Sequence, residues 1–347
     1  MIKEYLHVKD KYAWEKFLKK FDNISIYQSL EWFNILKNSF GLSGNHLVSK
    51  NNEDINGCLP LMLIKNMILG KKLISMPHGS SGGGVITKEK IIESDLIDKA
   101  INIIKEKNIG YLEIRSDIPK TIYKEKGFIH TNPFVKHILS LEDEDTNWKN
   151  VSRGHKSSIN KSNGIEIKEL ADTNELKIWF QIYQTSNRDF GTPAYGLNMF
   201  NHIYNELFNR KMAKILLCIF GGKIIGGILL LSFGDTVIYR LGAVDSDYLK
   251  YRPFNKLLWA GIKDSIRNNY SYFDMGTSAI DNFGLIDFKN RFGSDSFPVN
   301  FYYFINNKSI PQMENYLSKD SISKKIWKKL PVFLTKKLSV PIRKWIC

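Results

Sequence analysis

The stretch from Tyr270 to Gly293 reads YSYFDMGTSAIDNFGLIDFKNRFG, and it decides how the second half of the chain is interpreted. Its first residues include alternating aromatics up to Asp274, and a turn at Gly276 leads into small polar residues. This pattern predicts a strand that ends in a loop, where scaffolds usually display functional groups. Further on, Lys289 lies between two phenylalanines, so its ammonium group either reaches water or meets a negative charge. Taken alone, the stretch also fits a buried strand followed by a solvated loop.

The elements before this stretch favour a specific fold. Three expected strands follow one another closely and are joined by tight glycine turns at Gly221-Gly222 and Gly234-Asp235. A helix with apolar residues at four-residue steps comes next and leads directly into the strand at Tyr272. A strand–helix–strand step of this length predicts a parallel, right-handed crossover beside an antiparallel meander. The sheet is therefore expected to be mixed. The three strands are expected at 213–220, 224–233 and 236–244.

The first half of the chain repeats this order of helices, hairpin, third strand, helix and closing strands. The two halves share few identical residues, so the repeat is one of architecture. We therefore predict an α/β fold of two tandem domains, each with a mixed, mostly antiparallel sheet flanked by helices. A length of 347 residues agrees with two domains. The expected divisions are residues 1–150, residues 151–310 and a basic amphipathic tail at residues 311–347.

Composition excludes several classes of protein. The three cysteines are widely spaced and the histidines are scattered, which argues for a reducing cytoplasm and against a disulfide or metal framework. The first residues lack an apolar run, so no signal peptide is predicted. The net charge is +15, but residues 319–347 hold nine basic residues and one acidic residue, a net charge of +8. Because the excess lies in the tail and no recognition motif accompanies it, a nucleic-acid binder is disfavoured.

The predicted order of elements is that of the GNAT acyltransferase fold, and a set of short motifs makes the resemblance more specific. Together these motifs span roughly residues 25 to 305. The chain resembles the FemAB-like family, which attaches amino acids to peptidoglycan precursors, and its acyltransferase relatives. The motifs are Tyr27–Trp32, Gly191–Pro193, Tyr239–Ala243, Arg252–Asn255 with Leu258-Trp259, Phe273–Gly276 and Phe288–Gly293.

This resemblance implies transfer of an acyl or aminoacyl group onto an amine of a cell-envelope precursor, with Phe288 and Lys289 at the reaction centre. Simple GNAT enzymes hold the coenzyme A pyrophosphate in a glycine-containing loop. The corresponding residues 250–255 contain no glycine, and their bulky side chains should block close approach of a pyrophosphate. The coiled-coil arm of many aminoacyl-tRNA users is also not evident, since no long heptad run occurs. The donor therefore stays open between acyl-CoA and aminoacyl-tRNA, and no resident cofactor is predicted.

Amide formation requires a neutral amine, a stabilised oxyanion and help for the leaving group. We predict Lys289 and Asp274 as the catalytic residues. Lys289 would supply positive charge, and Asp274 is either a proton acceptor or a hydrogen-bond partner of the next loop. Strand alternation sends only one of Tyr239 and Arg240 into the site. The predicted substrate-binding residues are Trp32, Tyr239, Arg240, Arg252, Asn255, Thr277 and Phe288.

Arg252, Thr277 and a glycine-rich loop need separate comment. Arg252, together with the basic run at residues 153–161, is expected to bind phosphates of a nucleotide- or lipid-linked precursor. Thr277 stands where several relatives carry arginine after the Asp-x-Gly motif. A glycine-rich loop at residues 79–84 is either a flexible connection or a phosphate cradle, because its spacing matches no nucleotide-binding motif.

Two classes of function follow. The first is an N-acyltransferase of the FemAB-like type, and the alternative is a catalytically idle GNAT-like module that binds a membrane-linked glycan or a biosynthetic partner. In residues 319–347, apolar side chains alternate with basic ones. This pattern predicts a peripheral anchor at the anionic inner face of the cell membrane. The competing interpretation of this tail is an amphipathic helix packed on the protein body.

Overall fold

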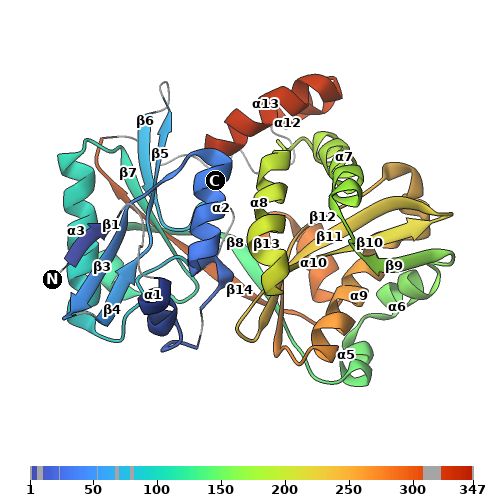
Figure 1. Cartoon of the computed structure of the whole chain (residues 1–347), viewed down its shortest axis with the longest axis horizontal. Helices are drawn as coiled ribbons and strands as arrows, with labels where there is room; N and C mark the ends of the chain where they lie inside the picture. Colours follow the sequence, from blue (N-terminus) through green and yellow to red (C-terminus); the bar gives the residue numbers. More distant parts are fainter. Residues whose placement is uncertain are drawn as a thin grey trace. The chain divides into compact units, whose positions relative to one another are not determined.

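The computed structural model describes residues 2–5, 11–22, 24–52, 54–66, 70–78, 82–307 and 322–345. The chain divides into two compact units (Figure 1). Unit 1 comprises residues 1–134, 298–314 and 344–347, and unit 2 comprises residues 135–297 and 315–343. The boundary expected at residue 150 lies inside unit 2. The helix before residue 150 belongs to unit 2 because it packs there: the Trp148 ring centre lies 4.8 Å from that of Trp259.

Unit 1 is built on two sheets. One is a three-stranded antiparallel sheet of order β1-β3-β4. In the other, β2 pairs with β5, β5 pairs with β6, and β6 runs parallel to β7, which pairs antiparallel with β14. The strands are β1 (Ile2–Tyr5), β2 (Ser43–Gly44), β3 (His46–Asn51), β4 (Asp54–Leu59), β5 (Met62–Asn66), β6 (Gly70–Ile74), β7 (Tyr111–Ser116), β8 (Ile129–Ser140) and β14 (Asp295–Ile305).

The helices of unit 1 follow from ordinary capping and amphipathic patterns. Ser29 caps α2, whose end is closed by Gly41 in the left-handed conformation. The apolar face of α3 lies in a core with residues of β3, β4 and β7, including Leu47, Leu59 and Leu112. The helices are α1 (Lys11–Leu18), η1 (Ile26–Gln28), α2 (Leu30–Phe40), α3 (Lys90–Glu106) and α4 (Thr121–Glu125).

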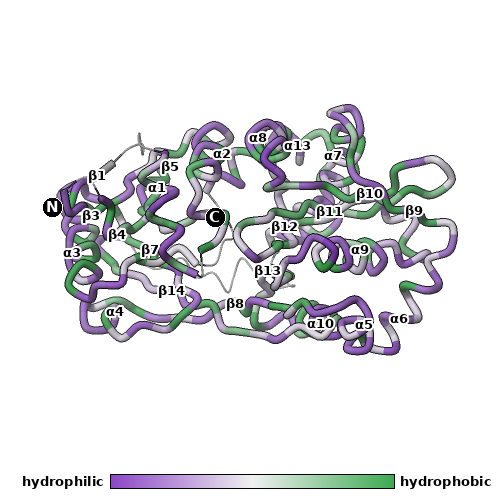
Figure 2. Tube along the Cα trace, turned by 60° about the horizontal axis from the view of Figure 1, so that its bottom comes forward, coloured by the Kyte–Doolittle hydropathy of each residue, from purple (hydrophilic) through white to green (hydrophobic). Residues whose placement is uncertain are grey.

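Unit 2 has the sheet order β8-β13-β12-β11-β10-β9. Strands β9 to β12 pair antiparallel, whereas β12 and β13 pair parallel because α9 forms the crossover between them. The predicted mixed, mostly antiparallel sheet is confirmed. Its central strand β11 carries a hydrophobic run (Figure 2). The strands are β9 (Ile165–Glu169), β10 (Ala213–Phe220), β11 (Lys223–Phe233), β12 (Thr236–Val244) and β13 (Tyr272–Ala279).

Helices cover both faces of this sheet, as neighbouring residues of β11 show. A Cβ on Gly227 would lie 3.0 Å from the indole nitrogen of Trp179 in α7. Adjacent Ile228 points the other way and packs against Gly261 in α9. The helices of unit 2 are α5 (Glu144–Asn150), α6 (Arg153–Asn160), α7 (Thr173–Phe190), α8 (Leu197–Leu207), η2 (Phe208–Arg210), η3 (Ser246–Tyr251), α9 (Pro253–Arg267), α10 (Phe283–Asn290), α12 (Ile322–Lys329) and α13 (Val332–Trp345).

The C-terminal helix α13 buries a polar stripe. Thr335 and Ser339 are buried, and the Ser339 hydroxyl accepts the Ala194 N–H at 3.2 Å and donates to the Thr335 carbonyl at 2.6 Å. By contrast, the apolar side chains of Phe333 and Leu338 are exposed. The helix therefore buries small polar groups against unit 2, and it also contacts unit 2 through Val340 beside Gly196 and Arg343 over the Tyr195 ring. Within the described residues, no helix combines the length and apolar character needed to cross a membrane.

Candidate active site

The site begins where two parallel strands of unit 2 diverge. β12 and β13 pair through Thr236–Ile238 and Tyr272–Asp274, and both strands continue beyond this short ladder. On the opposite edge of β12, the register to β11 shifts so that Leu229 faces Leu241 and Leu230 faces Tyr239. Arg240 is therefore the extra residue of a β-bulge, a device that bends a strand and re-aims its side chains.

Lys289 lies at this point and is buried, with 5% of its surface exposed. It comes from α10, and its ammonium donates to the carbonyl oxygens of Gly276 at 3.2 Å and Thr277 at 3.0 Å. Gly276 has a φ of +72°, and a Cβ there would come within 3.3 Å of the Tyr239 carbonyl and 4.0 Å of the Lys289 Nζ. Glycine thus allows the close approach of β12, β13 and the lysine.

Asp274 orders the start of this loop. One carboxylate oxygen accepts the Gly276 N–H at 2.7 Å, and the other lies 3.5 Å from the Lys136 ammonium on β8. This is the loop hydrogen bond that the sequence allowed for Asp274. Burial lowers the pKa of Lys289 to about 8, and the charge of Asp274 acts in the opposite direction. Groups whose pKa is shifted in this way are common at functional sites.

A second buried network, not predicted from the sequence, stands beside Lys289. The fully buried His137 contacts the Ser278 hydroxyl through Nε2 at 3.1 Å. Its Nδ1 lies 3.0 Å from Asn290 Oδ1 and 3.1 Å from the Ser296 hydroxyl, which itself donates to Asn290 Oδ1. Both partners of Nδ1 are thus acceptors, so Nδ1 carries the proton and Nε2 accepts from Ser278.

The ionisation of His137 agrees with this assignment. Burial and then the charge of Lys289 lower the pKa of His137 to about 4, so the imidazole is neutral at physiological pH. Neutral His137 on β8 thus contacts side chains of β13, the end of α10 and the start of β14, close to Lys289. Sequence reasoning missed it because a lone histidine in an alternating strand carries no motif.

The Phe-Lys segment of α10 is held from α6. His155 Nε2 lies 2.9 Å from the Phe288 carbonyl oxygen, and the imidazole packs on the rings of Phe288 and Phe292. The basic run at residues 153–161 therefore folds as a helix whose histidine supports the site. Because Gly293 has a φ of +91°, the chain turns sharply behind this pair of aromatics.

Arg240 and Tyr239 leave β12 toward different partners. The Arg240 guanidinium donates to the Tyr195 hydroxyl at 2.8 Å, and the Arg343 guanidinium of α13 lies 4.2 Å from the centre of the Tyr195 ring. Burial opposes ionisation of Tyr195, but the two guanidinium groups hold its pKa below the usual value. Tyr239 packs edge-on against Phe254 of α9, and burial raises its pKa.

The remaining predicted residues have different surroundings. Thr277 contributes its carbonyl oxygen to Lys289, as described above. Arg252 is exposed, has a φ of +57° at the start of α9, and its carbonyl accepts the Ser162 hydroxyl at 3.3 Å. Asn255 is buried in the first turn of α9. Trp32 belongs to unit 1, where it is fully buried against Tyr27.

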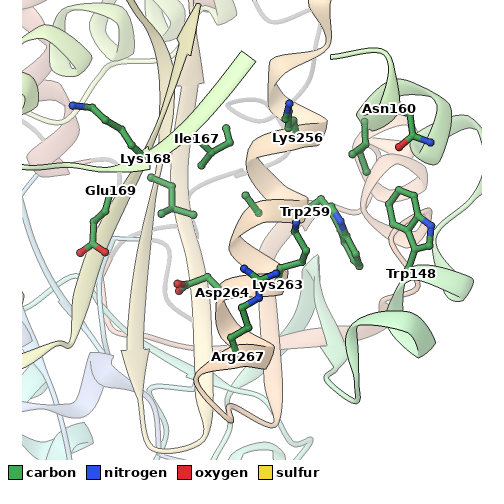
Figure 3. A pocket seen from close by; sticks show the side chains of 13 residues that line it. Trp148, Asn160, Ile167, Lys168, Glu169, Lys256, Trp259, Lys263, Asp264 and Arg267 are labelled. Atoms are coloured by element: carbon green, nitrogen blue, oxygen red, sulfur yellow. The ribbon is translucent and has the colours of Figure 1, made fainter. Parts of the chain in front are cut away.

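A hollow of about 730 Å³ lies on another part of unit 2, over the outer face of α9 (Figure 3). Several of its charged groups are engaged within the protein. Lys256 donates to the Ser162 and Ile165 carbonyls, Asp264 pairs with Lys214, and Arg267 pairs with Glu144. The predicted catalytic residues do not line it, so the site we describe is the cluster around Lys289. In the described part of the chain, no group of three or more histidine, cysteine or acidic residues could hold a metal ion.

Comparisons with known proteins give one domain match and several matches of the fold. Residues 149–290 match the family model described as "Acetyltransferase (GNAT) domain". No curated protein matches the sequence. Among solved structures, FemX has a TM-score of 0.72 and 15% identity, covering 92% of this chain and 100% of its own. L-PGS from Bacillus licheniformis has a TM-score of 0.59 and 13% identity, covering 92% and 99% of the two chains.

A tandem GNAT protein from the clavulanic acid biosynthesis pathway is also similar, with a TM-score of 0.55, 11% identity, and coverage of 89% of this chain and 99% of its own. These structural likenesses concern the fold. Residues 149–290 of unit 2 thus match a GNAT domain model, and the chain has the fold of tandem GNAT proteins, as the sequence predicted. The matches support an acyltransferase.

Proposed function

We propose that the protein is an N-acyltransferase that moves an acyl or aminoacyl group onto an amine of a cell-envelope precursor. The observation that carries this proposal is the buried Lys289 ammonium at the point where β12 and β13 diverge. Two of its three N–H donors bind the Gly276 and Thr277 carbonyls, which leaves the third for an oxyanion. The resemblance in fold to FemX supports an envelope precursor as the acceptor.

In the proposed reaction the neutral amine attacks the carbonyl carbon of the donor, and a C–N bond forms as the carbonyl oxygen becomes negative. The intermediate collapses by expelling the thiol or hydroxyl leaving group, which takes a proton as the nitrogen loses one. Lys289 stabilises the negative oxygen in a site removed from water, where such interactions are strongest. Asp274 holds the loop backbone through the Gly276 N–H, and neutral His137 holds the side chains of Ser278, Asn290 and Ser296.

Detection of the product by intact mass is the direct test. The purified protein is incubated with amine acceptors and either acyl-CoA or charged tRNA, and a mass increase equal to the transferred group is expected with one donor. The alternative, a catalytically idle GNAT-like module, is favoured by the absence of glycine in residues 250–255. Binding of an envelope precursor without any product would support that alternative.

We expect weak binding of acetyl-CoA at the start of α9. Arg252 caps this helix in the left-handed conformation, and Pro253 removes one of the N–H groups that could bind a pyrophosphate. Calorimetry should therefore give a dissociation constant well above the micromolar range. Micromolar binding that is lost in Arg252→Ala would contradict this expectation and would identify acyl-CoA as the donor.

We further propose that α12 and α13 hold the protein at the inner face of an anionic membrane. The tail does pack on unit 2, as the competing interpretation required, and it buries Trp327, Thr335 and Ser339. Its exposed apolar side chains are interleaved with basic ones. This outward arrangement is what an interfacial helix needs, because apolar groups insert while lysines meet lipid phosphates.

Reversing two exposed charges of α13 should reveal this contact. Each basic residue near an anionic surface contributes about 1 kcal/mol, so Lys336→Glu with Lys337→Glu should weaken sedimentation with phosphatidylglycerol vesicles by at least tenfold. The matched control is Lys19→Glu with Lys20→Glu, an exposed pair in unit 1. Equal losses in both double variants would mean that only overall charge matters.

A further inference from the structure

A hollow of about 570 Å³ lies in unit 1, bordered by α3 and the three-stranded sheet, two elements that pack together (Figure 1). The helix contributes Ile92, Asp95 and Asn102 to its lining, and the sheet contributes Asn51 of β3 and Asn56 of β4. Its volume falls within the range of about 300–1,000 Å³ that is usual for small-molecule sites. Neither the proposed acyl transfer nor the tail uses this part of the molecule.

A β-bulge brings Asn56 to the hollow. The register of β4 against β3 shifts between Gly57 and Ile55, which leaves Asn56 as the extra residue. The Thr87 hydroxyl donates to the Asn56 carbonyl oxygen at 2.9 Å and so holds the bulged backbone. Bulges re-aim side chains and are enriched beside functional sites, which makes the side chain of Asn56 a candidate for function.

The Asn56 side chain carries a buried acceptor that no other part of the described chain satisfies. Its Oδ1 is shielded from solvent and accepts no hydrogen bond from a described residue. Such a group costs free energy in the folded state, and proteins keep such costs mainly where a function needs them. The χ2 torsion of asparagine is broad, so rotation of the amide lets the oxygen accept from a donor in the hollow. Asn56 thus points to a ligand that donates hydrogen bonds.

The charges around the hollow nearly balance, which narrows the class of ligand. Its lining includes the ammonium groups of Lys50 and Lys99 and the carboxylates of Asp95 and Asp98. Asp98 pairs with Lys126, which does not line the hollow, so two ammonium groups face one further carboxylate. The lining therefore selects neither a strongly anionic nor a cationic ligand. It combines donors with acceptors, and hydroxyl groups are both at once, so a neutral molecule rich in hydroxyls fits it.

We propose that this hollow is a binding site for a neutral saccharide. Hydroxyls of the sugar donate to the side-chain oxygens of Asn56 and Asp95 and accept from the Lys99 ammonium, while a C–H face of the ring lies on Ile92. A peptide is also neutral, but it offers one N–H and one C=O per residue, a lower density of donors and acceptors than a sugar ring. The site would hold the glycan part of an envelope molecule, and it needs no acyl transfer.

Saturation-transfer NMR of the full chain tests the site without any acyl donor or amine. The probes are neutral oligomers of glucose, mannose and N-acetylglucosamine, and an acetylated, amidated alanine peptide is the comparison. At least one sugar should bind the wild type. Asn56→Leu keeps a similar shape without the polar atoms and should weaken binding about tenfold, and Asn102→Ala, on the exposed face of α3, about two- to tenfold.

The melting temperature separates a binding role of Asn56 from a structural one. Because Leu replaces an acceptor that lacks a partner, Asn56→Leu should melt at or above the temperature of the wild type. The matched control is Asn306→Leu in the same unit, since the Asn306 amide donates to the Ile104 and Ile109 carbonyls at 3.2 and 3.0 Å. This variant should melt lower and, while folded, bind the sugar like the wild type.

The contrary outcomes are distinct. If no sugar binds, or if Asn56→Leu and Asn102→Ala both bind it like the wild type, the hollow is not a saccharide site. A fall in melting temperature for Asn56→Leu as large as that for Asn306→Leu would assign the amide to folding instead. Peptide binding that Asn56→Leu weakens would replace the saccharide by a peptide. None of these results bears on acyl transfer, which is judged by product mass.

Discussion

Replacing Lys289 by Met is expected to slow turnover by about 10²–10³-fold, as for loss of one well-placed donor to an oxyanion. Met keeps an unbranched side chain of similar length and removes the charge. The change also leaves the Gly276 and Thr277 carbonyls without the ammonium donor, which costs about 1–3 kcal/mol of unfolding free energy, and this cost is partly offset because the unfavourable buried charge is removed. Turnover must therefore be measured per folded molecule, at a temperature well below the melting point of the variant.

Lys256 offers a matched control in the same unit. Its ammonium also donates to two backbone carbonyls, those of Ser162 at 3.2 Å and Ile165 at 2.7 Å, but on another part of unit 2. Lys256→Met should lower the melting temperature at least as much and leave turnover nearly unchanged. If both variants are equally destabilised and equally active, Lys289 has only a structural role, and the proposed mechanism is wrong.

The pH dependence of turnover and that of stability should run in opposite directions above pH 8. Lys289 has a pKa of about 8 in the folded protein, below the usual 10.5 of lysine. Between these values the unfolded chain binds the proton that the folded protein has lost. The contribution of Lys289 to the unfolding free energy therefore rises with pH across this window, by about 1.4 kcal/mol per unit. Below pH 8 this contribution of Lys289 to the unfolding free energy is unfavourable and does not change with pH.

Turnover that depends on the ammonium should instead fall up to tenfold per pH unit above 8, because only the charged form stabilises the oxyanion. Deprotonation of the acceptor amine raises the rate in the same range, so the comparison is between profiles of wild type and Lys289→Met. The wild type should show the falling limb and the variant should lack it. A wild-type rate that rises through pH 8 like that of the variant would exclude a role for the charged lysine.

The sequence predicted the architecture of unit 2 because each step had a local signal. Glycine turns marked the β10–β11–β12 meander, and the four-residue spacing of Leu258, Ile262 and Ile266 marked the crossover helix. Lys289 and Asp274 were both named as catalytic residues, and in the structure Lys289 binds the loop after Asp274, which is close in the chain. Local spacing suffices where the partners lie within about twenty residues of each other.

Long-range partners of the site gave no such signal. His137 meets Ser278 across 141 residues, and Tyr195 meets Arg240 across 45 residues. These contacts depend on which strands become neighbours, and no pattern in a single strand encodes that. The bulge at Arg240 also displaces the side-chain alternation used for Tyr239 and Arg240. Arg252, Asn255 and Trp32 were named from the resemblance, and their roles as substrate-binding residues stay predictions.

The strand pairing of unit 1 has a consequence for synthesis of the chain. β7 pairs antiparallel with β14, and Ser116 and Asn300 in this pair are 184 residues apart. At about 5–20 residues per second, the ribosome needs roughly 10–40 s to produce the second strand after the first. During this interval the edge of β7 that pairs with β14 is unpaired, while all of β9 to β13 is synthesised. The β9–β13 sheet of unit 2 is therefore expected to form before β7 finds its partner, and a fragment ending at residue 150 should expose an unpaired strand and aggregate.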